Sequence, residues 1–238
     1  MKIFAHRGLS SIYPENTLIA FQKALEYKID GIETDVQMTK DGELVIIHDE
    51  VLNRTTNGKG FVKDHTLQEL KALNANDGKD GFYEIPTLHE LLTLLKNYPN
   101  IIINLELKTS IFEYVGIERK VYEEIKKSNI QNPIIISSFN HISLQKFKEL
   151  DSTIKFGVLT ADRLINAEEY VKNNDFQCFH PMYVYCTKEN VEKAHKYGLE
   201  VNAWTVDLKP AYDVLKHIGV DGIFTNCCDR FTRKIEGN

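Results

Sequence analysis

The chain has few of the features that mark membrane, secreted or nucleic-acid-binding proteins. No apolar stretch approaches the roughly 20 residues that a membrane helix needs, and the N-terminus enters a strand-like run at Ile3 without a signal-peptide pattern. The formal net charge of -5 provides no basic excess for nucleic acid. We therefore expect a cytoplasmic protein with no stable membrane anchoring and no nucleic-acid partner. Assembly as a homodimer stays open.

Spaced cysteine pairs and linker segments are also lacking. The four cysteines form no C-x-x-C pair, and Cys227 and Cys228 are adjacent, which is not the usual spacing of a tetrahedral zinc site. We expect ordinary reduced thiols. No Pro/Gly/Ser-rich linker divides the 238 residues, a length that suits one α/β barrel, so a single domain is expected over residues 1–238.

Apolar, β-branched runs alternate with helical patterns along the chain, which is typical of repeated βα units and a parallel sheet. The predicted strands are residues 3–6, 31–36, 101–107, 134–138, 154–159, 178–180, 200–204 and 222–225. The predicted helices are residues 17–27, 88–96, 113–127, 144–150, 164–173, 188–197 and 208–217. Eight such units predict an α/β fold, a closed (β/α)₈ TIM barrel.

The segment 44–48 does not fit this barrel count. Only a few residues separate it from the strand at 31–36, whereas a parallel crossover needs roughly a dozen or more. We expect an antiparallel return that, with the polar stretch 53–80, forms a small insertion at about residues 37–85, between the second strand and its helix. Loops of this length in compact domains are usually functional.

The stretch 31–49 carries a cluster of titratable residues. Glu33 and Asp35 lie two apart in a predicted strand and therefore share one face. A two-residue turn at 41–42 would set Asp35 directly opposite His48, with Cβ atoms roughly 5 Å apart. A change of one residue in the length of this loop would turn His48 to the other face.

Three carboxylates are predicted at the carboxyl ends of neighbouring strands, where active sites of (β/α)₈ barrels lie. Glu33 and Asp35 belong to the second strand and Glu106 to the third. Their oxygens suit a hard divalent cation, Mg²⁺ or Ca²⁺. The sequence therefore predicts a metal site at this end of the barrel.

Basic side chains accompany these carboxylates. His6 and His48 would flank the ion, and a pair of histidines can divide the work of general base and general acid. Arg7 and Lys108 add positive charge that suits an oxyanion. Together these groups predict phosphoryl transfer on a small-molecule substrate that carries a phosphate.

Taken singly, such residues also have plain structural interpretations. A lone E-x-D pattern usually marks a solvated face or an ion pair, and Glu15 could simply favour a helix N-terminus through the helix dipole. Trp204 could pack rather than bind, and His180 could be a core or rim histidine. The predicted placement of the whole set at one rim favours the functional interpretation.

A series of short motifs runs from the first strand to the last. They are H-R-G at 6–8, P-E-N-T at 14–17, E-x-D at 33–35, D-G at 41–42, H-D at 48–49, L-x-R-T-T at 52–56, E-x-K at 106–108, S-S-F at 137–139, W-T at 204–205 and D-G-I-x-T-N at 221–226. In this order and spacing they resemble the glycerophosphodiester phosphodiesterase family, whose members are PI-PLC-like TIM-barrel phosphodiesterases.

The resemblance implies a TIM barrel that hydrolyses glycerophosphodiesters, such as glycerophosphocholine or glycerophosphoethanolamine, to sn-glycerol 3-phosphate and an alcohol. It also implies roles for individual residues by matching position. Glu33, Asp35 and Glu106 would hold a divalent metal, His6 and His48 would be the acid/base pair, Arg7 and Lys108 would bind phosphate, and Phe139 and Trp204 would line the pocket.

Several alternatives stay open at this point. A same-fold phospholipase of the sphingomyelinase D or PI-PLC type would act on an intact lipid, and a non-catalytic module would only bind a glycerophosphodiester. For the hydrolase, the sequence does not decide which histidine is the acid, or whether water or the glycerol 2-hydroxyl attacks. The head group and the physiological metal are likewise undecided.

Overall fold

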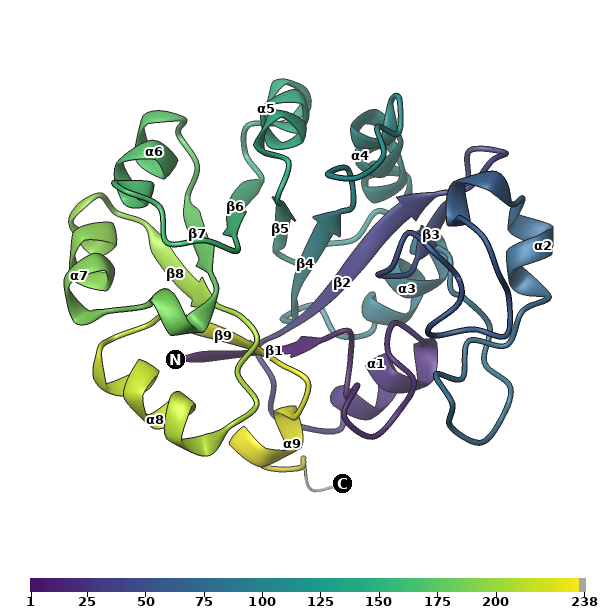
Figure 1. The fold of residues 1–238 in the computed structure, drawn as a ribbon, viewed down its shortest axis with the longest axis horizontal. Helices are drawn as coiled ribbons and strands as arrows, with labels where there is room; N and C mark the ends of the chain where they lie inside the picture. Colours follow the sequence, from purple (N-terminus) through teal and green to yellow (C-terminus); the bar gives the residue numbers. More distant parts are fainter. Residues whose placement is uncertain (236–238) are drawn as a thin grey trace.

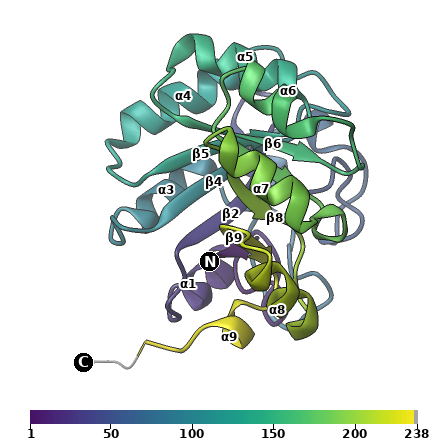
Figure 2. The same cartoon turned by 90° about the vertical axis from the view of Figure 1, so that its left-hand side faces the viewer.

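The strands form a closed ring with the helices outside it, as a computed structural model shows for residues 1–235 (Figure 1, Figure 2). The eight parallel strands of this part of the chain are β1 (Lys2–His6), β2 (Gly31–Met38), β4 (Ile102–Leu107), β5 (Ile134–Ser138), β6 (Lys155–Thr160), β7 (Cys178–Pro181), β8 (Glu200–Ala203) and β9 (Gly222–Thr225). Because β1 pairs with both β9 and β2, the ring is closed. The predicted (β/α)₈ barrel is confirmed.

The described part of the chain has nine helices: seven begin and end within four residues of the predicted points, and the short ones at 67–71 and 228–231 lie outside the predicted helices. The nine are α1 (Leu18–Ala24), α2 (Leu67–Lys71), α3 (Leu88–Leu95), α4 (Ile117–Ser128), α5 (His141–Leu150), α6 (Ala167–Asn173), α7 (Lys188–Lys196), α8 (Lys209–His217) and α9 (Cys228–Phe231), with single 3₁₀ turns η1 (Val62–Asp64) and η2 (Tyr183–Tyr185). Thr87 caps α3: its hydroxyl accepts the Glu90 N–H, and the Glu90 carboxylate accepts the Thr87 N–H. Gly198 and Gly219 follow α7 and α8 with φ of 76° and 89°, the left-handed conformation that ends a helix.

Helix α4 shows how the outer layer attaches to the barrel. Ile117, Val121 and Ile125 recur at four-residue spacing and are buried, whereas Glu123 and Lys127 lie on the exposed face. This helix has 12 residues. Among residues 1–235, no helix is both long enough and apolar enough to cross a membrane.

The insertion between β2 and α3 has a small hydrophobic core of its own. Its buried side chains include Val45, Leu52, Val62 and Ile85, each at most 1% exposed. Burying aliphatic side chains of this size contributes roughly 1.5–3 kcal/mol each. The insertion, which lies at one side of the barrel (Figure 1), is therefore a packed structure and can hold functional side chains in place.

The predicted register of the hairpin within this insertion is wrong by one residue. The observed partners in β2 and the antiparallel strand β3 (Leu44–Ile46) are Val36 with Ile46, Gln37 with Val45, and Met38 with Leu44. The turn contains three residues rather than two, and Gly42 at its end adopts a φ of 84°. Ile47 therefore lies opposite Asp35, with its N–H 3.2 Å from the Asp35 carbonyl oxygen. If the ladder continued, His48 would face away from the carboxylates.

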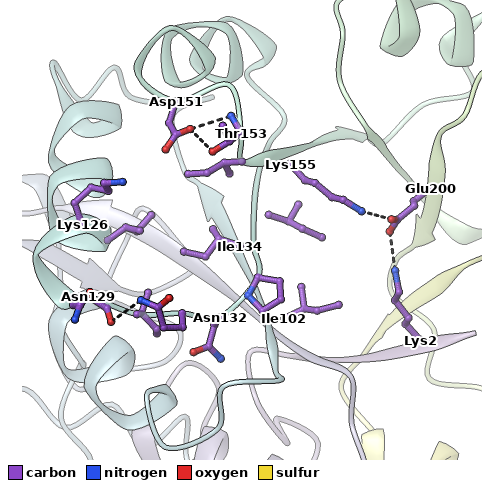
Figure 3. Close-up of a pocket in the computed structure, with 16 residues that line it drawn as sticks. Lys2, Ile102, Lys126, Asn129, Asn132, Ile134, Asp151, Thr153, Lys155 and Glu200 are labelled. Carbon is purple, nitrogen blue, oxygen red and sulfur yellow. Dashed lines mark hydrogen bonds and ion pairs between the residues drawn. The ribbon is translucent and has the colours of Figure 1, made fainter.

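The amino end of the barrel carries a broad groove (Figure 3). The Glu200 carboxylate at this end accepts hydrogen bonds from Lys2, at 2.8 Å, and from Lys155. The Asp151 carboxylate accepts the backbone N–H of Thr153 at 2.9 Å and its hydroxyl at 2.6 Å. Both acidic groups that line the described groove are thus already bound by neighbours within the chain and offer a cation little.

Candidate functional site

Strand register brings the predicted acidic residues together at the carboxyl end of the barrel. His6 of β1 lies beside Glu33 of β2, and Asp35 of β2 lies beside Glu106 of β4. One carboxylate oxygen from each of the three acidic residues lies within 4.8 Å of the others. Glu33 and Asp35 are two residues apart and so share one face of β2, and the parallel register adds Glu106 from β4. These two features are sufficient to form the cluster.

The cluster has the properties that a hard divalent cation requires. Glu33, Asp35 and Glu106 are 4%, 0% and 8% exposed. Within residues 1–235, Asp35 Oδ1 is buried and has no hydrogen-bond donor, a situation that is costly unless a cation compensates it. A ligand set made only of oxygen atoms fits Mg²⁺ or Ca²⁺ better than zinc. The three carboxylates therefore fit a divalent metal.

The three carboxyl groups differ in their proton affinity. Burial, with the neighbouring charges of Asp35 and Glu106, raises the pKa of Glu33 well above its ordinary value. Burial also raises the pKa of Glu106, against the opposing effect of Lys108. Burial would raise the pKa of Asp35 as well, but Arg7 and other positive neighbours outweigh it, so the pKa of Asp35 is lowered. A cation at the cluster would relieve the repulsion that raises the pKa of Glu33.

Two cationic side chains lie against these carboxylates. Arg7 Nε is 3.3 Å from Asp35 Oδ2, and Arg7 Nη1 donates to Glu15 Oε1 at 3.0 Å. The Arg7 backbone adopts φ of 58°, a conformation that non-glycine residues seldom adopt outside sites that need it. Lys108 Nζ donates to Glu106 Oε1 at 3.0 Å and is 3.8 Å from Asp35 Oδ1. Both side chains thus bring positive charge to the edge of the carboxylate cluster.

His6 is held from one side by an amide. Its Nδ1 lies 2.7 Å from Asn226 Oδ1, and its Nε2 lies 3.8 Å from Glu33 Oε2. Burial, reinforced by the charge of Arg7, lowers the pKa of His6 to about 4. The ring is therefore neutral near pH 7 and can accept a proton there.

His48 lines the same cleft as His6, although the observed hairpin register alone would turn its side chain to the other face. β3 ends at Ile46, and after the remaining ladder bond from Ile47 the chain turns around the side chain of Gln37. The Gln37 amide Nε2 lies 3.1, 3.0 and 2.8 Å from the carbonyl oxygens of three successive residues, Ile47, His48 and Asp49. His48 Nδ1 is 2.6 Å from Asp49 Oδ1. The turn thus brings His48 into the cleft that His6 also lines, which the observed hairpin register alone could not have done.

A chain of ion pairs ties this turn to the loop that follows β1. Arg54 donates to both oxygens of Asp49, at 2.7 and 2.9 Å, and to both oxygens of Glu15, at 2.8 and 2.7 Å. Glu15 in turn accepts from Arg7. Although burial alone would raise it, the pKa of Asp49 falls to about 2, since hydrogen bonds from Arg54 and His48 favour the carboxylate. His48 is therefore paired with a carboxylate that stays ionised.

Aromatic residues also form part of the wall of the cleft. Phe139 and Trp204 pack edge to face, with ring centroids 5.4 Å apart. Trp204 Nε1–H donates to the carbonyl oxygen of His180 at 2.8 Å, which fixes the indole. The cleft as a whole is lined by His6, Arg7, Glu33, His48, Asn104, Glu106, Ser137, Phe139, Leu159, Trp204, Thr205 and Phe224. His180 itself lies wholly inside the barrel, and burial lowers its pKa to about 3.

Sequence reasoning missed several residues that support the site. Glu15 is an acceptor for two arginines rather than only an acid near a helix N-terminus, and Arg54 had no assigned role. Gln37 continues the spacing of two that begins at Glu33, so the alternation along this strand was a usable signal. Asn226 lies in a motif at the end of the last strand, but nothing in its spacing indicates a contact with His6.

Comparison with known proteins agrees with this geometry. The model of the glycerophosphoryl diester phosphodiesterase family matches residues 6–230. A protein of Bacillus altitudinis named glycerophosphodiester phosphodiesterase is 45% identical over 237 residues, which is 96% of this chain and 96% of that protein. A protein of the same name from Caldanaerobacter subterraneus is 43% identical, covering 94% of this chain and 93% of the relative.

Solved structures show the same fold. An Oleispira antarctica phosphodiesterase in complex with the product sn-glycerol-3-phosphate superposes with a TM-score of 0.90, at 30% identity, covering 97% of this chain and 94% of that one. A crystal structure of a Silicibacter pomeroyi protein gives a TM-score of 0.88 at 25% identity, covering 95% of this chain and 90% of that one. The family match, the relatives and the shared barrel lead to one conclusion: the chain belongs to the glycerophosphoryl diester phosphodiesterase family of enzymes.

Proposed function

We propose that the protein hydrolyses glycerophosphodiesters to sn-glycerol 3-phosphate and an alcohol, with a divalent cation and a pair of histidines. The observation that carries this proposal is the convergence of Glu33, Asp35 and Glu106 within 4.8 Å, with Arg7 and Lys108 beside them. Phosphodiesters are anionic, so a site for one needs positive charge held in place. The Oleispira antarctica phosphodiesterase, whose structure contains the product sn-glycerol-3-phosphate, supports the same chemistry.

The phosphate group is the part of the substrate that the charged side of the cleft would bind. The metal ion, Mg²⁺ or Ca²⁺, would be held by Glu33, Asp35 and Glu106. When bound there, it would neutralise charge on the phosphate oxygens. Arg7 offers a planar fork for phosphate oxygens, and Lys108 offers a compact charge. To bind the phosphate, Arg7 and Lys108 must each replace part of their contact with the carboxylates by contact with phosphate oxygens.

The two histidines would move the protons. One ring nitrogen removes the proton of the attacking hydroxyl or water, and the other histidine protonates the alcohol oxygen as its bond to phosphorus breaks. His6 and His48 line the same cleft, which a paired acid and base require. Water attack and attack by the glycerol 2-hydroxyl both satisfy this arrangement.

The aromatic wall would contact the uncharged parts of the substrate. Phe139 and Trp204 are fixed against each other and present their rings to the cleft. We propose that they line the region of the glycerol or of the leaving alcohol. Glycerophosphocholine and glycerophosphoethanolamine are the substrates that we propose to test first, because they differ only in the size and methylation of the cationic head.

One panel of assays tests this function. Purified protein is incubated with several glycerophosphodiesters, and in parallel with lysophospholipid and phospholipid vesicles, in Mg²⁺, in Ca²⁺ and in excess chelator. We expect sn-glycerol 3-phosphate from the soluble diesters only when a cation is present. Cleavage of the lipid in the vesicles alone would instead identify a phospholipase. Calorimetric binding of a glycerophosphodiester without any hydrolysis would identify a binding protein.

A further inference from the structure

We propose that Asp207 and Asn226 act as a positioning pair that fixes the imidazole hydrogen of His6 on Nδ1, so that the lone pair of Nε2 is left free to take a proton. The inference rests on the proposed function, which it refines by assigning His6 as the base. Neither Asp207 nor Asn226 lines the cleft with the carboxylates; both line an adjoining pocket that shares His6 and Arg7 with that cleft, and the role proposed for them is exerted through His6.

Asp207, in the segment between β8 and α8, receives three hydrogen bonds from the end of β9. Its Oδ1 accepts the Thr225 hydroxyl at 3.0 Å and the Asn226 backbone N–H at 2.8 Å. Its Oδ2 accepts the Asn226 side-chain amide at 2.7 Å. Backbone and side chain of Asn226 are thus both bound to one carboxylate, which leaves its side chain a single orientation.

This contact decides which way the Asn226 amide points. A carboxylate only accepts hydrogen bonds, so the group that faces Asp207 must be the amide NH₂. The carbonyl oxygen Oδ1 then faces the opposite direction, toward His6 Nδ1 at 2.7 Å and the Ser10 hydroxyl at 2.9 Å. With the amide reversed, its oxygen would face Asp207 Oδ2 at the same 2.7 Å, which two acceptors cannot share.

The orientation of the amide decides the tautomer of His6. An amide oxygen can only accept, so the hydrogen of this pair must be on His6 Nδ1. In a neutral ring the other nitrogen then carries a lone pair, and Nε2 is the nitrogen on the side of Glu33. The Ser10 hydroxyl can also donate to the His6 carbonyl oxygen, at 2.7 Å, so it is not needed to set the tautomer.

His6 and His48 have different hydrogen-bond partners at Nδ1. His6 Nδ1 faces a neutral amide oxygen, whereas His48 Nδ1 faces the Asp49 carboxylate, which only accepts hydrogen bonds. In the resulting step the nucleophile O–H gives its proton to His6 Nε2 as its oxygen bonds to phosphorus. The bond from phosphorus to the alcohol oxygen breaks, and that oxygen takes a proton from His48.

The decisive variant is Asp207→Asn, which keeps the size of the side chain. An amide at position 207 can donate to Asn226 Oδ1, so the Asn226 amide is free to reverse and present its NH₂ to His6. The ring hydrogen would then move to Nε2. We expect kcat to fall by about 10²- to 10⁴-fold, the range found when a catalytic base is lost or held in the wrong tautomer, with KM and cation affinity little changed.

A direct readout comes from the ring nitrogens themselves, without turnover. Two-bond proton–nitrogen correlation spectra of protein labelled with ¹⁵N-histidine, in chelator and at mildly alkaline pH, report which nitrogen carries hydrogen, and His6→Gln assigns the signals. Wild type should show hydrogen on Nδ1, Asp207→Asn should show it on Nε2, and Asn226→Ala should show a mixture. Ser10→Ala is the matched control and should keep both the wild-type pattern and kcat.

The outcomes separate the positioning pair from the proposed function. Hydrogen on Nε2 in wild type, or an unchanged pattern and kcat in both Asp207→Asn and Asn226→Ala, would overturn the positioning pair. If Asp207→Asn fails to fold, Asn226→Ala decides by the same two readouts. Absence of sn-glycerol 3-phosphate release by wild type would contradict the function alone, because the spectra do not depend on it.

Discussion

The side-chain amide of Gln37 donates to the carbonyl oxygen of His48 at 3.0 Å. Gln37 is fully buried, and its own Oε1 accepts the hydroxyl of Tyr114 at 2.8 Å, so the amide is fixed from behind. This contact places His48 at the mouth of the barrel although the hairpin register would turn it away. The position of His48, a proposed catalytic residue, therefore depends on Gln37, which does not line the cleft.

Replacement of Gln37 should disable the site without removing any group from the cleft. In Gln37→Ala the carbonyl oxygens of the turn at 47–49 lose their donor, so we expect a loss of about 1–3 kcal/mol in the free energy of unfolding and a fall in kcat. Tyr114→Phe, which removes only the bond to Oε1, serves as the milder control. Denaturant unfolding and steady-state kinetics check this, and a wild-type kcat in a folded Gln37→Ala protein would contradict it.

Arg54 should matter for catalysis more than for stability. Its side chain is 44% exposed, and ion pairs at such positions contribute little, about 0–1 kcal/mol. It nevertheless orients Asp49, the partner of His48. We expect Arg54→Lys, which keeps the charge but loses the planar fork, to lower kcat with little change in thermal stability.

Lys63→Ala is the control for Arg54, since it removes an exposed ion pair with Asp64 in the same insertion. Its kcat should match wild type. Equal effects of the two substitutions on kcat would show that Arg54 has no special connection to the site.

Cation affinity should increase with pH. In the metal-free protein the raised pKa of Glu33 keeps a proton on this carboxyl group above the usual pH range, and a cation must displace that proton to bind. Affinity should therefore fall as pH is lowered through the raised pKa, by up to about tenfold per pH unit for one proton. Calorimetric titration in two buffers of different ionisation enthalpy measures the protons released, and binding without proton release would refute this.

Two isosteric substitutions in the cluster should have opposite effects on the metal-free protein. Glu33→Gln removes a buried charge that its neighbours disfavour, so thermal stability in chelator should rise, and increasingly so as pH passes upward through the raised pKa of Glu33. Asp35→Asn leaves the buried charge of Arg7 with one partner fewer, so stability should fall, by roughly 3 kcal/mol. Thermal unfolding in chelator checks both, and a shift of the same sign for both variants would contradict the assignment of charges.

Much of the fold could be predicted from local sequence signals. The β-branched runs, the capping threonine at Thr87 and the glycines at Gly198 and Gly219 act over a few residues, and the structure places the elements close to where these signals indicate. The carboxylate cluster could be predicted for the same reason, because the alternation of side chains along β2 and the barrel order depend on no distant contact.

The surroundings of the histidines could not be predicted in this way. A turn with Gly42 at its end fits two residues or three, and this single difference reverses the face that His48 would take. The hydrogen bonds that restore His48 to the cleft come from Gln37, and those behind His6 come from Asn226, which is 220 residues away in the chain. Such contacts exist only after the barrel has closed.

The most direct test measures sn-glycerol 3-phosphate release from glycerophosphocholine and glycerophosphoethanolamine by wild type and by Glu106→Gln, across a titration of Mg²⁺ or Ca²⁺ that begins in excess chelator. The three-carboxylate site predicts no release in chelator, saturable recovery in wild type, and a recovery curve for Glu106→Gln displaced to much higher cation concentration. Undiminished release in chelator, or superimposable curves for the two proteins, would contradict it.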